Sequence, residues 1–240
     1  MYSAAAGMAA QQQRLDALSN DVANVNTTGY KRVRVAFRDL LYTPERLATQ
    51  GITEGAGSAA TIVGRGHAQG SLQRTEEPLD VAIHGPGFLR MRRADGTEIL
   101  TRDGNLRVDA QGRLGSERGD LVQPEIRLPE GASPADLKIA PDGRVTLAGR
   151  ELGRLQIVTV ASPDGLRALG DNGFEATAAS GAVRAAPATT TLEQGALEGS
   201  NVDMGDAMAE MMEAQRAYEM ASRAIQAQDR AAEIANAIKR

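Results

Sequence analysis

Apolar residues recur with a heptad spacing over the first 26 residues of the chain. The stripe positions are Ala4, Met8, Gln11, Leu15, Leu18, Val22 and Val25, separated alternately by four and three residues. This spacing keeps a stripe on one face of a helix with about 3.5 residues per turn. Gln12, Asp16 and Asn20 place polar side chains on the opposite face. The pattern predicts an amphipathic helix that packs against at least one other helix.

The C-terminal segment, residues 204–238, repeats this design. Met211, Tyr218, Ile225 and Ala232 recur every seven residues, and Ala207, Ala214, Ala221, Gln228 and Ala235 fill the intermediate positions. Asn201 or Asp203 is expected to cap the helix, since both side chains accept backbone N–H bonds at a helix N-terminus. The helix would extend roughly 52 Å, whereas a compact chain of this length has a diameter of roughly 45 Å.

Both stripes are narrow and rich in small residues, so neither helix is expected to be stable without a neighbour. The two terminal helices can meet this need by forming a coiled coil with each other. Alternatively, they can also pack against other copies of the chain. The pattern leaves both arrangements open.

Between the helical zones, short segments alternate between apolar and polar residues. Strands are predicted over residues 79–83, 88–92, 106–108 and 155–160,. Turn-forming pairs such as Asp95-Gly96 and Asp142-Gly143 separate such segments,. Short strands with frequent turns predict an antiparallel β domain.

These patterns predict an α+β fold class. We expect long N- and C-terminal helices that form a coiled-coil inner domain, with a β-rich antiparallel middle domain. The expected domains are a discontinuous helical assembly domain (1–28 and 201–240), a connecting extended region (29–77) and a β-rich outer domain (78–200).

The composition of the chain excludes several classes of function but says less about its fold. The 240 residues carry a net charge of −4 at pH 7, so neither general polyanion binding nor a nucleic-acid partner is predicted. No apolar run approaches the roughly 20 residues of a membrane-spanning helix, so no membrane insertion is expected. The N-terminus lacks the basic and apolar regions of a Sec-type signal peptide. The absence of cysteine excludes thiol nucleophiles, disulfides and thiolate zinc sites.

No catalytic residue, metal ligand or cofactor is predicted. The two histidines, His67 and His84, have no neighbouring Ser and Asp in a recognisable nucleophile elbow,. The Asp-Gly pairs lack the later Glu of a calcium loop, and the glycine-rich segments 64–66 and 85–87 do not open helices as phosphate loops do,. A glycan- or phosphate-acting enzyme on a β scaffold is therefore a disfavoured rival.

A basic segment follows the first helix. Lys31, Arg32, Arg34 and Arg38 are interleaved with Val33, Val35 and Phe37. We interpret this pattern as an amphipathic strand with a solvated basic face, because no second basic cluster or aromatic platform supports binding to bases. On this interpretation Lys31 is exposed, and its loss is expected to be mild.

Five segments resemble the family of flagellar basal-body rod and hook proteins. They are residues 18–31 (LSNDVANVNTTGYK), 80–89 (DVAIHGPGFL), 101–106 (TRDGNL), 195–203 (GALEGSNVD) and 215–219 (QRAYE). Residues 37–42 (FRDLLY) and the chain length resemble the distal rod protein more than its proximal paralogue or the longer hook subunit. The stretch 43–70 is shorter and richer in Gly and Ala than is expected of a distal rod protein, and residues 129–145 match no recognised detail of the family.

The resemblance implies a structural subunit of the flagellar basal body, exported through the flagellum's own channel. In this family the terminal helices stack helically into a hollow tube that transmits motor torque, and no reaction is catalysed. The implied partners are further copies of the chain, the proximal rod and hook proteins, and the export apparatus. The alternatives are a proximal rod paralogue, a hook-type axial protein, or an adaptor that binds a partner through its terminal helices.

Two groups of residues are candidates for function. The expected assembly interface consists of Met8, Leu15, Leu18, Val22, Val25, Met211, Tyr218 and Ile225. The expected joint consists of Asn24, Asn26, Thr28, Gly29, Tyr30 and Lys31. The first helix is expected to end here, and Gly29 to take the positive φ that ends a helix or turns the chain. The joint is either a simple helix end and turn, or it also fixes the angle between the inner helix and the outer domain.

Overall fold

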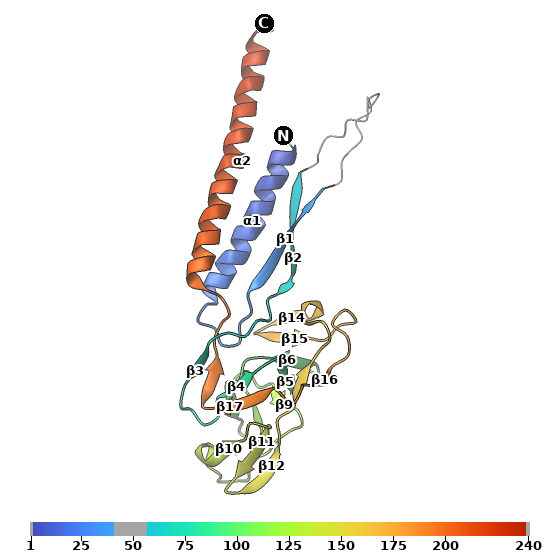
Figure 1. Ribbon diagram of the computed structural model, residues 1–240, viewed down its shortest axis with the longest axis vertical. Helices are drawn as coiled ribbons and strands as arrows, with labels where there is room; N and C mark the ends of the chain where they lie inside the picture. Colours follow the sequence, from blue (N-terminus) through green and yellow to red (C-terminus); the bar gives the residue numbers. More distant parts are fainter. Residues whose placement is uncertain (1, 41–56, 239–240) are drawn as a thin grey trace. The chain divides into compact units, whose positions relative to one another are not determined.

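The computed structural model describes residues 2–40 and 57–238 (Figure 1). The chain folds into two compact units. We call Met1–Ala23, Val33–Gly64 and Asp203–Arg240 the terminal unit, and Asn24–Arg32 and Arg65–Val202 the middle unit. The chain therefore passes from one unit to the other four times.

The terminal unit contains two long helices and a pair of strands. These are α1 (Tyr2–Ala23), β1 (Val33–Asp39), β2 (Ser58–Arg65) and α2 (Met204–Ile238). β1 and β2 pair with each other, and α1 packs against both α2 and β1. Asp203 caps α2, because its Oδ1 accepts a hydrogen bond from the Asp206 amide at 3.0 Å. No helix within the described ranges is both long and apolar enough to cross a membrane.

The predicted coiled-coil inner domain is wrong. The most deeply buried side chains of the helices are Ala10, Ala17, Leu18 and Asp21 on α1 and Ala207 and Ala214 on α2, rather than a continuous seam of large residues. α1 packs mainly against α2 but also contacts β1, so its buried face is not covered by a partner helix alone, as it is in a two-helix coiled coil. In addition, α2 has 35 residues and α1 only 22, so much of α2 has no helix of this chain to pair with.

The middle unit is built from antiparallel strands. Its nine-stranded sheet contains β14 (Arg167–Gly170), β15 (Gly173–Glu175), β6 (Glu98–Thr101), β5 (Phe88–Arg92), β9 (Leu121–Val122), β8 (Leu114–Ser116) and β7 (Leu106–Val108) in spatial order, with β13 (Ile157–Thr159) also pairing with β5 and with β16 (Arg184–Ala185). A three-stranded sheet has the order β10 (Leu137–Ile139), β11 (Arg144–Leu147) and β12 (Arg150–Arg154). Two further pairs are β17 (Thr191–Gln194) with β4 (Val81–His84), and β18 (Ala196–Glu198) with β3 (Leu72–Arg74).

Each predicted strand of the middle segment corresponds to an observed one. The predictions over 88–92 and 106–108 coincide with β5 and β7, while those over 79–83 and 155–160 overlap β4 and β13. Alternation is a local property of the strand, since successive side chains point to opposite faces, and this explains why it could be found without the fold.

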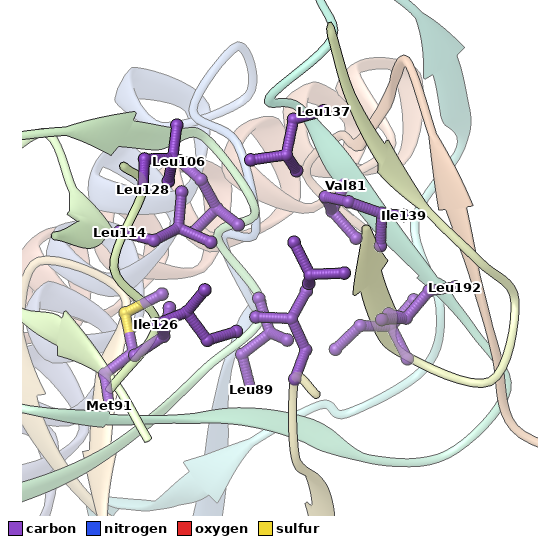
Figure 2. Close-up of a cluster of buried hydrophobic side chains, with 14 residues drawn as sticks. Val81, Leu89, Met91, Leu106, Leu114, Ile126, Leu128, Leu137, Ile139 and Leu192 are labelled. Atoms are coloured by element: carbon purple, nitrogen blue, oxygen red, sulfur yellow. The ribbon is translucent and has the colours of Figure 1, made fainter. Parts of the chain in front are cut away.

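One aliphatic core joins three of the four sheets of the middle unit. Figure 2 shows a cluster in which β4, β5, β7, β8, β10 and β17 each contribute at least one buried side chain. Val81, Leu114 and Val145 are completely buried within it. A second cluster contains Phe88 and Phe174. Since a buried Leu or Ile contributes about 1.5–3 kcal/mol, the middle unit has a large hydrophobic contribution to its stability.

Candidate functional site

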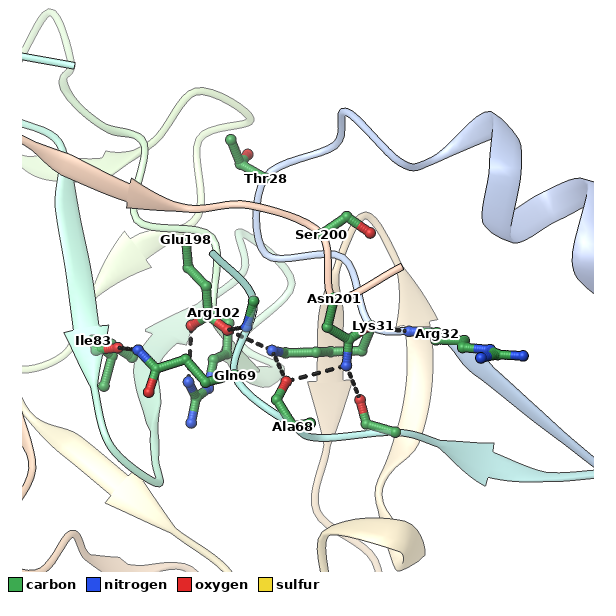
Figure 3. Close-up of polar contacts among 12 residues, drawn as sticks. Thr28, Lys31, Arg32, Ala68, Gln69, Ile83, Arg102, Glu198, Ser200 and Asn201 are labelled. Carbon is green, nitrogen blue, oxygen red and sulfur yellow. Dashed lines mark hydrogen bonds and ion pairs between the residues drawn. The ribbon is translucent and has the colours of Figure 1, made fainter. Parts of the chain in front are cut away.

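Four polar residues from distant parts of the sequence meet inside the middle unit. We call Lys31, Arg102, Glu198 and Asn201 the junction cluster (Figure 3). Lys31 follows the end of α1, Arg102 follows β6, Glu198 ends β18, and Asn201 lies shortly before α2. The cluster therefore lies next to the points where the chain leaves the middle unit for β1 and α2.

Glu198 is the centre of a buried ion-pair network. Its Oε1 lies 2.5 Å from Lys31 Nζ and its Oε2 lies 2.8 Å from a guanidinium nitrogen of Arg102. The side chains of Lys31 and Glu198 have no exposed surface, and that of Arg102 is 4% exposed. A single carboxylate thus neutralises part of two buried positive charges.

Backbone groups satisfy most of the remaining hydrogen-bonding capacity. Lys31 Nζ also donates to the Ala68 carbonyl at 2.7 Å, and Arg102 donates to the Gly85 carbonyl at 2.7 Å. Glu198 Oε1 accepts from the Gly70 amide at 2.9 Å. The network therefore fixes the segment between β2 and β3 as well as the segments after α1 and before α2.

Burial and charge act in opposite directions on the titration of this network. Burial alone would raise the pKa of Glu198, but the charges of Arg102 and Lys31 together with their hydrogen bonds hold that pKa below its ordinary value. Burial lowers the pKa of Lys31, and the attraction of Glu198 opposes that shift. Loss of one partner would leave a buried charge without compensation, which is strongly destabilising.

Asn201 ties three chain segments together through one side-chain amide. Its Oδ1 accepts from the Arg32 amide at 2.8 Å. Its Nδ2 donates to the carbonyls of Gly66 at 2.6 Å and Ala68 at 3.1 Å. Residues 32, 66 and 201 each lie within two residues of a point where the chain passes between units. The amide thus holds three of the four passages on the middle-unit side.

The turn at Gly29 is packed against the segment that carries Arg102. Gly29 has a φ of 67°, as predicted, and its amide donates to the Glu198 carbonyl at 2.8 Å. A Cβ at this position would lie 2.6 Å from the Asp103 amide nitrogen. Because real Cβ atoms do not approach backbone so closely, only glycine satisfies both the backbone conformation and the packing.

Asp103 and Asn172 hold the same turn from the other side. The Thr28 hydroxyl donates to Asp103 Oδ1 at 3.0 Å, and Asn172 donates to the Thr28 carbonyl at 2.7 Å. Burial raises the pKa of Asp103, although its hydrogen bonds oppose the shift. The turn is therefore part of the middle unit rather than a loose connection.

His67 packs against two phenylalanines close to the cluster. Its ring centroid lies 5.7 Å from that of Phe88 and 5.4 Å from that of Phe174, both in edge-on geometry. Its Nδ1 is buried and has no hydrogen-bond partner among the described residues. Burial, followed by the charge of Lys31, lowers the pKa of His67.

The predicted exposure of Lys31 is wrong. The residue precedes β1 rather than lying within it, and the ion pair with Glu198 compensates its burial. Arg34 and Arg38 do lie in β1 and are exposed. Alternation along the segment could not reveal this difference, because the partner of Lys31 is 167 residues away.

The structure brings together most of the predicted joint. Asn24 directly follows α1, and the Thr27 hydroxyl donates to its side-chain oxygen at 3.2 Å. Tyr30 is buried with the Arg65 guanidinium 5.1 Å from its ring centroid. Asn26 is exposed.

The predicted interface residues differ in burial and lie in both units. Leu18 is buried, and Tyr218 is 36% exposed. The half-buried members are Met8, Leu15, Val22, Val25, Met211 and Ile225. Val25 belongs to the middle unit, and the others to the terminal unit. Ala232 and Ala235, predicted on the same stripe, lie outside the residues whose side chains are described.

The sequence analysis did not identify Arg102, Glu198, Asn201, Asp103 or Asn172 as functional residues. Four of the five lie in the segments 101–106 and 195–203 on which the family resemblance rests. A signal was therefore present: each segment carries charged or amide side chains beside glycine. What could not be seen was that these side chains bind one another.

The cluster has the chemistry of a structural lock. Its carboxylate is saturated by two cations and an amide. Within residues 2–40 and 57–238, no group of three or more His, Cys, Asp or Glu side chains is placed to hold a metal ion. The arrangement can fix chain segments relative to one another inside the middle unit.

Comparison with known proteins identifies the class of protein to which such a fold belongs. Three family profiles match: "Flagella basal body rod protein" over residues 1–31, "Flagellar hook protein FlgE/F/G D1 domain" over 82–147, and "Flagellar basal body rod FlgEFG protein C-terminal" over 193–238. The chain belongs to the family of flagellar basal-body rod proteins, which are structural proteins.

Within that family the chain is similar to flagellar basal-body rod protein FlgG. It is 37% identical to FlgG of Borreliella burgdorferi, an alignment that covers 100% of this chain and 98% of the relative. It is 40% identical to FlgG of Agrobacterium fabrum over 96% of this chain and 95% of the relative. The chain is also 30% identical to flagellar basal-body rod protein FlgF of Escherichia coli, over 94% of this chain and 91% of the relative.

Proposed function

We propose that the chain is a structural subunit of the flagellar distal rod, which assembles with copies of itself into a hollow helical tube. The observation that carries this proposal is the end-to-end similarity to FlgG, at 37% and 40% identity. The lower identity to FlgF favours the distal over the proximal paralogue. The subunit transmits torque and catalyses no reaction.

The proposed location is the basal body within the cell envelope, reached through the flagellar export channel. The proposed partners are further copies of this chain and the proximal rod and hook proteins adjoining it in the axial structure. These partners follow from family membership, and the cofactor requirement of such a subunit is none.

The terminal unit is the proposed site of assembly. All large hydrophobic side chains that are exposed in the described residues lie in this unit: Phe37, Ile62, Val63, Met204, Met208, Met212, Tyr218, Met220 and Ile234. Exposed apolar surface of this extent is typical of an interaction surface. We propose that the assembly interface also includes residues that act by direct contact or by holding the helices in place: Met8, Leu15, Leu18, Val22, Met211, Tyr218 and Ile225. Val25 is proposed to contribute from the middle unit.

The junction cluster is proposed to anchor the passages of the chain into the terminal unit. Lys31, Glu198 and Asn201 bind one another's segments within the middle unit. A subunit that transmits torque needs such anchoring, because force applied to the terminal helices reaches the middle unit through these segments. On this proposal the joint, with Gly29 as its turn, is more than a simple helix end: it also fixes the angle between the inner helix and the outer domain.

Two measurements test the proposed function. The gene is expressed in a flagellated bacterium whose own flgG has been deleted, and isolated basal bodies are examined by electron microscopy together with swimming. Rods of full length and restored swimming are expected. Basal bodies that end at the proximal rod in cells that produce and export the chain would contradict the proposal, and filaments of concentrated purified protein would support it independently.

A further inference from the structure

The middle unit carries a groove whose charge and walls have no role in the junction cluster. The groove has a volume of about 710 Å³ and lies between β12, β13, β16 and the segment that leads into β17. Arg90, Arg154 and Arg184 line it, and Asp142 is the only carboxylate among the lining residues. Its floor is apolar and includes Leu155, Ile157 and Val158.

The arginines of the groove retain an unneutralised positive charge. Arg90 pairs with Glu98 at 2.5 Å, and the Asp142 carboxylate is engaged by Arg144 at 2.7 Å. Arg154 donates to the Asp142 backbone carbonyl, and among the described residues it forms no ion pair. Arg184 is exposed and has no charged partner within the described ranges. Two positive charges thus remain in a partly apolar groove, and Arg90 Nε there is buried without an acceptor among the described residues.

An acidic turn lies on the same unit. Glu76 and Glu77 are exposed and pair with no cation in the part of the chain that is described. Glu76 has a φ of 60°, a conformation in which glycine or asparagine is far less strained than glutamate. Strained backbone conformations cluster at functional sites, and an exposed side chain at such a position is free to contact something outside the unit.

The turn is held rigidly by β17 and the residue after it. The amides of Thr75 and Glu76 both donate to the Gly195 carbonyl, at 2.9 and 3.2 Å. Gln194 Nε2 donates to the Pro78 carbonyl at 2.6 Å. Thr191, at the other end of β17, lines the groove, so the turn and the groove are separated by the length of this strand, roughly 10 Å. A turn fixed in this way cannot swing into the groove of its own subunit.

We propose that the Arg90–Arg154–Arg184 groove binds the Glu76–Glu77 turn of a second copy of this chain. Two negative charges on a rigid turn are complementary to the two positive charges that the groove leaves free. The contact joins two different surfaces, so it is heterologous, and a repeated heterologous contact whose rotation does not close builds an open helical array. The inference rests on the proposed helical assembly and adds to it a contact between middle units.

Reciprocal charge reversal tests this contact. The full-length variants Glu76→Lys/Glu77→Lys and Arg154→Glu/Arg184→Glu are each expected to slow polymerisation of the purified protein about tenfold, measured by light scattering at 50 mM salt. Mixing the two variants, or combining all four substitutions, is expected to restore the rate. Glu130→Lys and Arg107→Glu, exposed reversals elsewhere on the middle unit, are the matched controls and should polymerise like the wild type.

Glu76→Gly separates contact from folding. Glycine relieves the strained φ, so this variant should melt no lower than the wild type while polymerising more slowly. The proposal is overturned if the reversed pairs behave like the controls, if the combined variant is no better than either pair, or if only the arginine reversals have an effect, which would indicate a different acidic partner. A wild-type chain that forms neither filaments nor rods would instead contradict the proposed function.

Discussion

The two units of this protein differ in how much apolar surface they bury. The middle unit buries a cluster of fourteen hydrophobic residues and a second cluster of five. The terminal unit buries mainly alanines along its helices and exposes Met208, Met212 and Met220 by more than half of their surface. The middle unit therefore covers its own apolar surface, whereas the terminal unit leaves apolar surface exposed, as is typical of an interaction surface.

The polar interactions of the two units differ in the same sense. The ion pairs of the junction cluster are almost entirely buried. In the terminal unit, the pair of Arg14 with Glu213 at 3.1 Å leaves the glutamate side chain 70% exposed. Exposed pairs contribute about 0–1 kcal/mol, whereas breaking a buried one costs several times more. Substitutions that break an ion pair should therefore cost the middle unit more stability than the terminal unit.

The largest effect is expected for Glu198→Ala. It leaves Lys31 and Arg102 buried without their carboxylate, which should destabilise the middle unit by about 3–5 kcal/mol. Urea unfolding combined with peptide-level hydrogen exchange would assign the loss to the middle unit. Glu193→Ala is the control, because the Glu193 carboxylate forms a long ion pair, at 3.8 Å, with the largely exposed Arg74. This variant should lose about 0–1 kcal/mol of stability. Equal losses for both variants would show that the network is not a lock.

A smaller effect is expected for Leu18→Asp, in the terminal unit. Leu18 is 4% exposed, so a carboxylate there should cost about 3 kcal/mol while the middle unit keeps its thermal transition. Ile225 is only half-buried, and Ile225→Asp should cost about 1 kcal/mol in the isolated chain.

Both of these variants are expected to block rod formation, Ile225→Asp because its side chain is proposed to face a neighbouring copy. Thermal melting and electron microscopy of basal bodies would be measured on the same variants. Full-length rods from Ile225→Asp would contradict its interface role, whatever its effect on stability.

Gly29→Ala should destabilise the middle unit by about 2 kcal/mol or more. The added Cβ has no space beside Asp103, and φ is positive. Gly29→Asn should also destabilise the middle unit. Asparagine tolerates a positive φ, but its Cβ would occupy the same position as that of alanine. Gly7→Ala in α1 is the matched change: a Cβ there meets nothing within 4 Å, and it should stabilise the helix by about 0.5–1 kcal/mol. The opposite signs would be read from urea midpoints.

The smallest effect concerns acid. Burial and the charge of Lys31 lower the pKa of His67 below its ordinary value of 6.5, with Arg102 acting in the same direction and Asp164 and the Pro163 carbonyl opposing. Below pH 6.5 the unfolded chain therefore binds a proton more readily than the folded one, and stability should fall as the pH falls toward the folded pKa.

Substitution His67→Gln should flatten this pH dependence between pH 7 and 5, and His84→Gln, at an exposed strand end, should leave it unchanged. Melting temperatures across this range decide the matter. A slope that persists in His67→Gln would assign the acid sensitivity to the carboxylates.

Local patterns in the sequence were sufficient for the helices, four of the middle strands, the helix end near Asn24 and the turn at Gly29. Each depends on neighbours within a few positions: a helical face repeats within two turns, alternation within a strand, and a positive φ is determined by the residue that adopts it. The family resemblance also follows from short segments read in order.

The packing of the helices and the fate of Lys31 depended on residues far away in the chain. No spacing near Lys31 indicates Glu198, and the basic alternation around it predicted exposure. Likewise, the helical stripes show that α1 and α2 need partners, but not that β1 contacts α1 beside α2. Whether a charge or an apolar stripe is buried depends on the surface that packs against it. That surface belongs to segments distant in the sequence, whose positions are fixed only when the whole chain has folded.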